Sequence, residues 1–384
     1  MKIREITLYP VHVPLVPLAQ GGIAPYIGSR DDAAGTRQGT TEAVSILFKV
    51  ETDEGVTGWG EMNPVLSLSL TRQFVEDLAK PVLIGQDPFQ IRQLLARFEG
   101  VYNPQLYTGT FLSGIEMACW DIKGKAVGRP VCDLLGGAVR TKMPVAYCLG
   151  MLPPDVLREK TVQIRQQGFS CIKLKGGNSV ADDILRTRLV REAAGPAMRL
   201  RMDVNQSYDM PAALTYLRAV EDCGLEYVEQ PLPAGRVADM ASLRGRSKVP
   251  LAINEDCYLP GNFAACLRGG AIDAAVVDLE ALGGIGALAR LGVLAGEAGL
   301  PLAHHCGFDM GVKTAAILQA VCACPSFTCA TDSTYHAHAD DILRRRFVLE
   351  DGCYRLPAGP GLGVEVDEEK VAFYSLGDCT RRFL

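Results

Sequence analysis

Seven ionisable residues follow one another at nearly constant intervals along the second half of this chain. The intervals are 28, 26, 26, 23, 27 and 27 residues, and the seven are Lys175, Asp203, Glu229, Glu255, Asp278, His305 and Asp332. One strand, one helix and two short loops take up about that length of chain. Each of the seven also ends a short apolar run rich in β-branched residues. The pattern predicts a β/α barrel with an active site at the carboxyl ends of its strands.

Strand and helix patterns alternate regularly from residue 143 onward. Eight apolar runs are expected to form strands, at residues 143–149, 170–176, 199–206, 225–231, 250–256, 274–280, 301–307 and 327–333. Amphipathic segments such as 154–167, 181–194, 210–222 and 285–298 separate them, as a parallel barrel requires. The fold class is therefore α/β, with a TIM-like barrel over residues 136–345.

The first 135 residues predict a separate α+β capping domain. Strand-like runs lie at 3–15, 43–52 and 56–62, and Asp53-Glu54-Gly55 is a hairpin turn between the last two. Three helical patterns follow, at 71–82, 88–98 and 110–127. After residue 345 the barrel pattern ends, and we expect the tail, residues 346–384, to return to the capping domain.

Residues 16–41 show neither helical nor strand periodicity and carry five glycines. A loop of this length in a compact enzyme is often a lid that closes over the substrate. Tyr26, Arg30 and Arg37 are then candidate substrate contacts. A surface loop without that role is the alternative.

Composition excludes several classes of function. The 384 residues carry a formal net charge of -5, with a pI near 5.7, so no basic surface is available for nucleic acid. No stretch of eighteen uninterrupted apolar residues predicts a membrane span. Thirteen cysteines, none in a CxxC motif, and a start without a hydrophobic signal region favour buried thiols in a cytoplasmic protein.

Three carboxylates end three adjacent predicted strands. Asp203, Glu229 and Glu255 should converge on one arc of the barrel mouth, and a set of hard oxygen ligands suits Mg²⁺. The alternative is that the three are solvated or paired with lysines of neighbouring strands. Three in succession at equivalent depth favour the metal site.

Two lysines lie two residues apart on the second strand and so point to the same side of it. Adjacent ammonium groups disfavour each other's charge, which would lower a lysine pKa toward the range of a general base. Lys175, nearer the strand end, is the better candidate, with Lys173 beside it. An ion pair between Lys175 and Asp203 is the alternative, and it is compatible with catalysis.

The sixth and seventh strands bring an aspartate beside a histidine. Asp278 would fix the tautomer of the imidazole and raise its basicity, which gives a second acid/base group. His304 and His305 are both available, but neighbours on a strand face opposite ways. Asp332 on the eighth strand is a candidate for contact with a substrate oxygen.

Residue order now suggests a reaction. A metal site on strands three to five would lie between a lysine on one side and a histidine on the other. Such a site suits removal of a proton next to a carboxylate, because the metal neutralises the enediolate and either base can move the proton.

The strand motifs resemble the enolase superfamily, specifically its mandelate racemase-like subgroup. The similarity covers essentially the whole chain, including the segment CWDIKGKAVGRPVCDLLGG at 119–137 that leads into the barrel. The barrel motifs that carry it are IKLK at 172–175, MDVN at 202–205, VEQPL at 228–232, INED at 253–256, VDLEALGGI at 277–285 and LAHHCG at 302–307.

This resemblance implies particular roles. One Mg²⁺ per subunit would bind Asp203, Glu229 and Glu255, Lys175 would be one base, and the Asp278–His305 dyad would be the other. His305 is preferred over His304 because members commonly place the histidine before a small residue such as Cys306. Asn205 is a further candidate for substrate contact.

Two positions depart from the family pattern. Members often carry a glutamate on the last strand, and Asp332 is one methylene shorter. The muconate-lactonizing branch would place an aspartate at Asn254 and a lysine at Asp278, so their absence argues against that branch.

Racemases and dehydratases of the subgroup share the first step. The Lys and Asp-His arrangement resembles acid-sugar dehydratases most, so dehydration of a hydroxylated carboxylate is favoured over racemisation or epimerisation. Two hypotheses from different classes are a Schiff-base aldolase that uses Lys175 and a barrel without catalytic activity. The expected partners are a small carboxylate substrate and further copies of the chain in a homo-oligomer.

Overall fold

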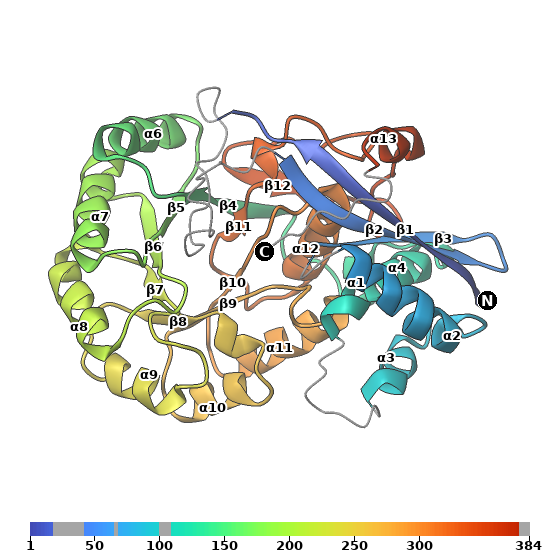
Figure 1. Ribbon diagram of the computed structural model, residues 1–384, viewed down its shortest axis with the longest axis horizontal. Helices are drawn as coiled ribbons and strands as arrows, with labels where there is room; N and C mark the ends of the chain where they lie inside the picture. The colour runs from blue at the N-terminus through green and yellow to red at the C-terminus, as the bar shows by residue number, and fades with distance from the viewer. Residues whose placement is uncertain (18–41, 65–67, 100–108, 376–384) are drawn as a thin grey trace.

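A barrel and a smaller sheet lie side by side in the computed structural model (Figure 1), which describes residues 1–17, 42–64, 68–99 and 109–375. The barrel is parallel throughout, in the order β10-β9-β8-β7-β6-β5-β4-β11. Its strands are β4 (Lys142–Leu149), β5 (Cys171–Lys175), β6 (Arg199–Asp203), β7 (Tyr227–Glu229), β8 (Leu251–Ile253), β9 (Ala274–Val277), β10 (Leu302–His304) and β11 (Thr331–Ser333). The predicted eight-stranded barrel is confirmed.

The barrel closes between β10 and β11 without a regular ladder. The amide of Leu302 donates to the carbonyl of Ser326 at 2.9 Å, and the amide of Cys329 donates to the carbonyl of Leu302 at 3.2 Å. Both contacts join β10 to the loop before β11, so the seam depends on that loop.

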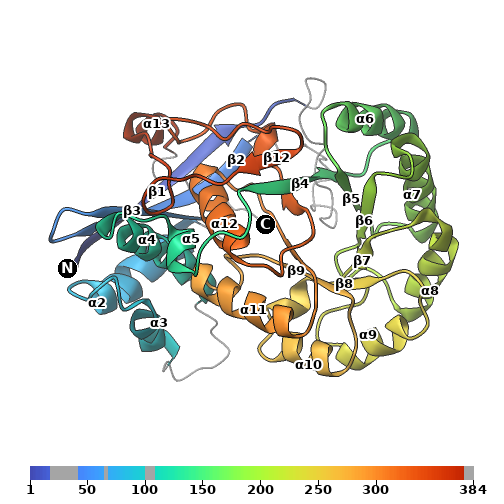
Figure 2. The ribbon, with the colours of Figure 1, turned by 180° about the vertical axis from the view of Figure 1, so that it is seen from behind.

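Helices surround the barrel in chain order (Figures 1 and 2). They are α6 (Pro154–Gln166), α7 (Val180–Ala194), α8 (Met210–Ala219), α9 (Val237–Arg244), α10 (Asn262–Arg268), α11 (Ile285–Glu297) and α12 (Gly311–Ala323), with short turns η3 (Glu221–Cys223), η4 (Glu255–Cys257) and η5 (Tyr335–Ala337). Side chains cap several of them. Ser179 accepts from the amide of Asp182 at the start of α7, and Asp209 accepts from the amide of Ala212 at the start of α8.

The N-terminal region forms an antiparallel sheet of β1 (Ile3–Pro14), β2 (Glu42–Thr52) and β3 (Thr57–Met62). Its helical elements are α1 (Leu68–Gln73), the π-helix η2 (Phe74–Ala79), α2 (Lys80–Leu83), α3 (Ile91–Glu99), α4 (Gly109–Ala126) and α5 (Val131–Leu134). Helix α4 packs so closely on β3 that a Cβ at Gly60 would collide with the carbonyl of Gly114. In place of the single helix predicted at 71–82, the structure has three elements, α1, η2 and α2. The π-helix η2 ends at Ala79, two residues before Pro81, which has no amide hydrogen to donate.

The tail contacts both parts of the molecule. Strand β12 (Cys353–Arg355) pairs antiparallel with β4 of the barrel. Helix α13 (Glu368–Phe373) lies against the N-terminal sheet, where Glu368 pairs with Lys49 at 2.8 Å and the carbonyl of Tyr374 accepts from the amide of His12 at 3.0 Å. The tail thus ties the small sheet to the first strand of the barrel.

Two sequence expectations about the whole chain can be compared with the described residues. None of the helices in that part of the chain combines the length and the apolar character needed to cross a membrane. The described cysteines are free thiols, and all of them except Cys353 are buried.

Candidate active site

Neighbouring strands bring the predicted residues to one end of the barrel. Lys175 on β5 pairs in register with Asp203 on β6, and Asp203 pairs in register with Glu229 on β7. The other members of the series follow their strands or, for Asp332, lie within β11. Two groups of contacts result, one around the lysines and one around the histidine.

We call the first group the lysine-side cluster: Lys173, Lys175, Asp203, Glu229 and Asp332. The Nζ of Lys175 lies 2.6 Å from Asp203 Oδ2. The Nζ of Lys173 lies 3.1 Å from Asp203, 2.8 Å from Glu229 and 2.7 Å from Asp332. All five side chains are buried. Every ammonium group in the cluster is therefore paired with carboxylates.

These contacts correct one expectation. Burial alone would lower the pKa of Lys173, but Asp203, Asp332 and Glu229 surround its ammonium group and raise its pKa well above the ordinary value. Repulsion between neighbouring ammonium groups is thus outweighed at Lys173. The same ion pairs act on Asp203, whose pKa is lowered by Lys173 and Lys175 although burial opposes this.

Asp332 is buried between two cationic side chains. It is 1% exposed. Its Oδ2 accepts from Lys173, and its Oδ1 lies 3.4 Å from Arg201 Nη1, which also donates to the carbonyl of Ala330 at 2.8 Å. Both of its oxygens therefore contact cations, Lys173 and Arg201, and the predicted contact with a substrate oxygen stays a prediction.

The predicted magnesium ligands fit a divalent cation in part of their geometry. Among the described residues, one candidate donor atom from each of Asp203, Glu229 and His305 lies within 4.8 Å of the other two. Glu255 is outside that group, but its Oε2 is buried and has no hydrogen-bond partner. A buried carboxylate oxygen without a hydrogen-bond partner fits a ligand of a divalent cation.

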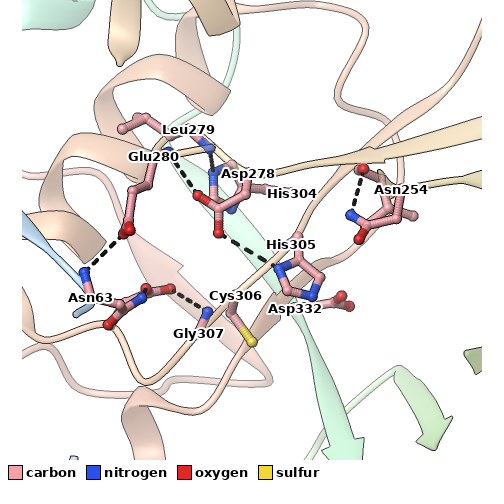
Figure 3. Close-up of polar contacts among 12 residues, drawn as sticks. Asn63, Asn254, Asp278, Leu279, Glu280, His304, His305, Cys306, Gly307 and Asp332 are labelled. Carbon is pink, nitrogen blue, oxygen red and sulfur yellow. Dashed lines mark hydrogen bonds and ion pairs between the residues drawn. The ribbon is translucent and has the colours of Figure 1, made fainter. Parts of the chain in front are cut away.

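On the opposite side, His305 and His304 have different surroundings (Figure 3). The Nδ1 of His305 lies 3.6 Å from Asp278 Oδ2, and its side chain is 25% exposed. The Nε2 of His304 accepts from the amide of Leu279 at 3.0 Å, and burial lowers the pKa of His304 to about 4. His304 is therefore a neutral, buried acceptor, while His305 is the histidine that faces the carboxylates.

A lysine that the sequence reasoning missed completes this side. We call this group the histidine-side cluster: Asp278, Glu280, His305, Asp309 and Lys313. The Nζ of Lys313 lies 3.4 Å from Asp278, 2.8 Å from Glu280 and 2.8 Å from Asp309. Lys313 is the one charged residue within Gly311–Ala323. That isolation in an apolar helix was the available signal, since a buried lysine needs partners.

Charges within the histidine-side cluster are unequal. Burial would raise the pKa of Asp278, but Lys313 and His305 hold it below its ordinary value. Burial raises the pKa of Glu280 to about 7, even though Lys313 opposes this. The amide of Asn63, just after β3, donates to Glu280 at 2.9 Å (Figure 3), so the small sheet contacts this cluster directly.

The backbone beside the lysine-side cluster is unusual. Asn205, Gln206 and Gln230 have φ angles of 44°, 65° and 37°, which non-glycine residues rarely adopt. The turn directs Asn205 Oδ1 to Lys175 Nζ at 3.0 Å. Asn205 is therefore in contact with the candidate base. The other predicted substrate contacts, Tyr26, Arg30 and Arg37, lie outside the described residues.

Two family models match most of the chain. The N-terminal domain model of mandelate racemase and muconate lactonizing enzyme matches residues 32–136, and the enolase C-terminal domain-like model matches residues 156–370. A D-galactarolactone cycloisomerase of Agrobacterium fabrum is 30% identical over 87% of this chain and 92% of its own. A D-galactonate dehydratase of Ralstonia pickettii is 31% identical over 85% of this chain and 90% of its own.

Solved structures agree with these matches. The crystal structure of N-succinyl Arg/Lys racemase from Bacillus cereus superposes with a TM-score of 0.87, covers 98% of each chain and is 27% identical. The three relatives named here carry out three different reactions according to their names, so similarity alone does not choose among them.

Proposed function

This chain belongs to the mandelate racemase/muconate lactonizing enzyme family of the enolase superfamily, and from that premise we propose that it removes the proton α to a carboxylate and dehydrates a hydroxy acid or acid sugar. Membership confirms the resemblance drawn from the strand motifs. It also makes the chain an enzyme. A non-catalytic barrel is therefore set aside.

One observation carries the proposal. Asp203 and Glu229 lie between two groups that can move a proton, with Lys175 contacting Asp203 on one side and His305 within 4.8 Å on the other. A carboxylate substrate held at these acids would have a base on each face of its α-carbon. The dehydratase of Ralstonia pickettii supports dehydration as the outcome.

Mg²⁺ is the proposed cofactor, with Asp203, Glu229 and Glu255 as its ligands. All the donors are hard carboxylate oxygens, and the partnerless Oε2 of Glu255 supports the fit. When bound, the cation would supply positive charge beside the substrate carboxylate, which lowers the free energy of the developing enolate.

The chain's own groups account for the proton movements. One base takes the α-proton, and the electron pair of that C–H bond forms a carbon–carbon double bond. Protonated His305 gives its proton to the β-hydroxyl, which leaves as water, and the enol then becomes a 2-keto acid. Asp278 holds the imidazole by its Nδ1, and Asn205 holds the Lys175 ammonium.

Racemisation or epimerisation is the second candidate, because it needs the same two bases and no leaving group. The racemase of Bacillus cereus, which superposes over nearly the whole chain, favours it. A Schiff-base aldolase that uses Lys175 is disfavoured, because it would leave the carboxylates of Asp203, Glu229 and Glu255 without a role.

A screen of hydroxy and sugar acids with Mg²⁺ in deuterated water tests the proposal. A 2-keto product indicates dehydration, whereas deuterium at the α-carbon without loss of water indicates racemisation. If no acid of a broad panel gives either product at any Mg²⁺ concentration, the result contradicts proton abstraction at this site.

We also propose a domain division, a location and an assembly for this chain. The division at residues 1–135, 136–345 and 346–384 is testable by limited proteolysis. A cytoplasmic location is supported by the free, buried thiols. Assembly into a symmetric homo-oligomer is proposed from the family resemblance.

A further inference from the structure

Helix α11 is apolar on its outer face as well as its inner one. Its only charged residues are Arg290 and Glu297. Val293 is 67% exposed and Leu294 is 45% exposed. A helix of an outer ring normally turns polar residues to water, as α7 does with its aspartates and arginines. Exposed apolar residues gathered on one helix indicate a surface that meets a partner.

The exposed residues of α11 form a self-complementary stripe. Arg290, Val293, Leu294 and Glu297 are all exposed. Their spacing of three, four and seven residues places them on one face of the helix. The stripe is apolar at its centre, with a positive charge at one end and a negative charge at the other.

We propose that α11 pairs antiparallel with α11 of a second copy of this chain, about a two-fold axis that passes between Val293 and Leu294. In that arrangement Arg290 of each copy faces Glu297 of the other, and Val293 of each faces Leu294 of the other. A two-fold contact requires this reciprocity. A parallel pairing would bring like charges together at both ends.

The surroundings of the stripe suit the same partner. Hollows of about 700 Å³ and 300 Å³ lie next to each other along α11, and Leu135, Ala289 and Val293 line both of them. Figure 2 shows α11 on the outside of the ring, between α10 and the helices of the N-terminal region. A helix ridge beside a hollow can pack against the equivalent ridge of a second copy, whose side chains enter the hollow.

This inference is independent of the proposed chemistry, since no residue of the stripe belongs to either cluster of the active site. Its first test is the mass in solution, measured by sedimentation velocity on the full chain. We expect twice 41.3 kDa, or an even multiple of it. Val293→Asp and Leu294→Asp should halve that mass.

Matched controls exist for both variants. Val348→Asp alters a valine of 68% exposure, and Leu185→Asp alters a leucine of 48% exposure, both away from α11. Both controls should keep the wild-type mass. Circular dichroism melting of all four variants establishes that they are folded.

A charge experiment tests the antiparallel arrangement itself. Arg290→Glu puts two acids opposite each other, and Glu297→Arg puts two bases opposite each other, so each variant alone should dissociate at least about tenfold more readily. Mixed together, the two variants should form a pair, because each then offers the charge that the other lacks.

Three results would overturn the proposal. They are a monomeric wild-type chain at micromolar concentration, an unchanged mass for both Val293→Asp and Leu294→Asp, and a failure of the two charge variants to associate when mixed. Catalytic activity is not a readout in any of these experiments, so their failure leaves the proposed reaction unaffected.

Discussion

The two sides of the barrel mouth carry similar groups but hold them in different ways. In the lysine-side cluster, two lysines contact three carboxylates at 2.6 to 3.1 Å, and every member lies on a barrel strand. In the histidine-side cluster, a single lysine from helix α12 serves three carboxylates, one of which also faces His305 at 3.6 Å.

The difference separates what the barrel provides from what the small sheet provides. The lysine side is complete within β5, β6, β7 and β11. The histidine side also depends on β3, because Glu61 accepts from the amides of Met310 and Lys313 at 2.6 and 2.8 Å, and Asn63 contacts Glu280. A substitution in the small sheet should therefore perturb the position of His305 more than that of Lys175.

Removing each base gives the largest expected effect and tests whether the two sides are equivalent. Lys175→Ala and His305→Asn should each lower turnover by about 10²- to 10⁴-fold, the usual contribution of a general acid or base. Each variant should still exchange the α-proton of one enantiomer of the substrate in deuterated water, as measured by NMR. The two variants should act on opposite enantiomers. Lys248→Ala, at an exposed site, is the control. Full activity in both variants would falsify the two-base mechanism.

Removing the central lysine of either cluster should destabilise the protein, because a different set of buried carboxylates loses its cation in each variant. Lys173→Met and Lys313→Met should each lower the free energy of unfolding by about 3 to 5 kcal/mol, because buried acids lose their cation. Urea unfolding measures this, with Lys248→Met as the exposed control. Saturating Mg²⁺ should restore part of the loss in Lys173→Met alone, since Asp203 and Glu229 are candidate ligands. Equal recovery in both variants would remove the distinction between the sides.

The sides should also differ in their response to pH. The pKa of Glu280 is raised from 4.5 to about 7, so the stability that it contributes is complete below about pH 4.5 and is lost as the pH rises through about 7. The pKa of Asp203 is lowered, so its contribution is lost only in acid. Glu280→Gln should reduce the loss of unfolding free energy between pH 5 and pH 8 by at most about 3 kcal/mol.

Urea unfolding at the two pH values measures that change, and Glu192→Gln on the surface is its control. An unchanged pH dependence in Glu280→Gln would show that this carboxyl does not titrate between the two values.

The smallest expected effect concerns Glu255, which lies between the two sides. Glu255→Gln should raise the Mg²⁺ concentration for half-maximal thermal stabilisation by at least about tenfold, because even groups outside the ligand shell contribute that much to metal affinity. Glu192→Gln again serves as control. An unaltered Mg²⁺ titration would take Glu255 out of the ligand set and leave Asp203 and Glu229 with His305 as the candidate group.

Local sequence patterns were sufficient for the barrel but not for all of its mouth. The strands and their order could be predicted because each apolar run and each helix repeats within about 30 residues. Lys313 was missed because its acids lie on other elements, brought together only by the closed barrel. The contacts of Asp332 with Lys173 and Arg201 could not be predicted for a similar reason, since these cations lie on other strands. The strand pattern alone left both histidines open, and the family resemblance favoured His305; in the structure the amide of Leu279 donates to His304.

The position of β4 has a consequence for how the chain is made. This strand pairs with β5 beside it in sequence, but also with β11 and β12 near the other end of the chain. At ordinary ribosomal rates, roughly 10 to 40 s pass between synthesis of β4 and synthesis of its last partners. Until then the edge of β4 is open to other strands. We therefore expect newly made chains truncated before residue 331 to require chaperones that the finished protein does not.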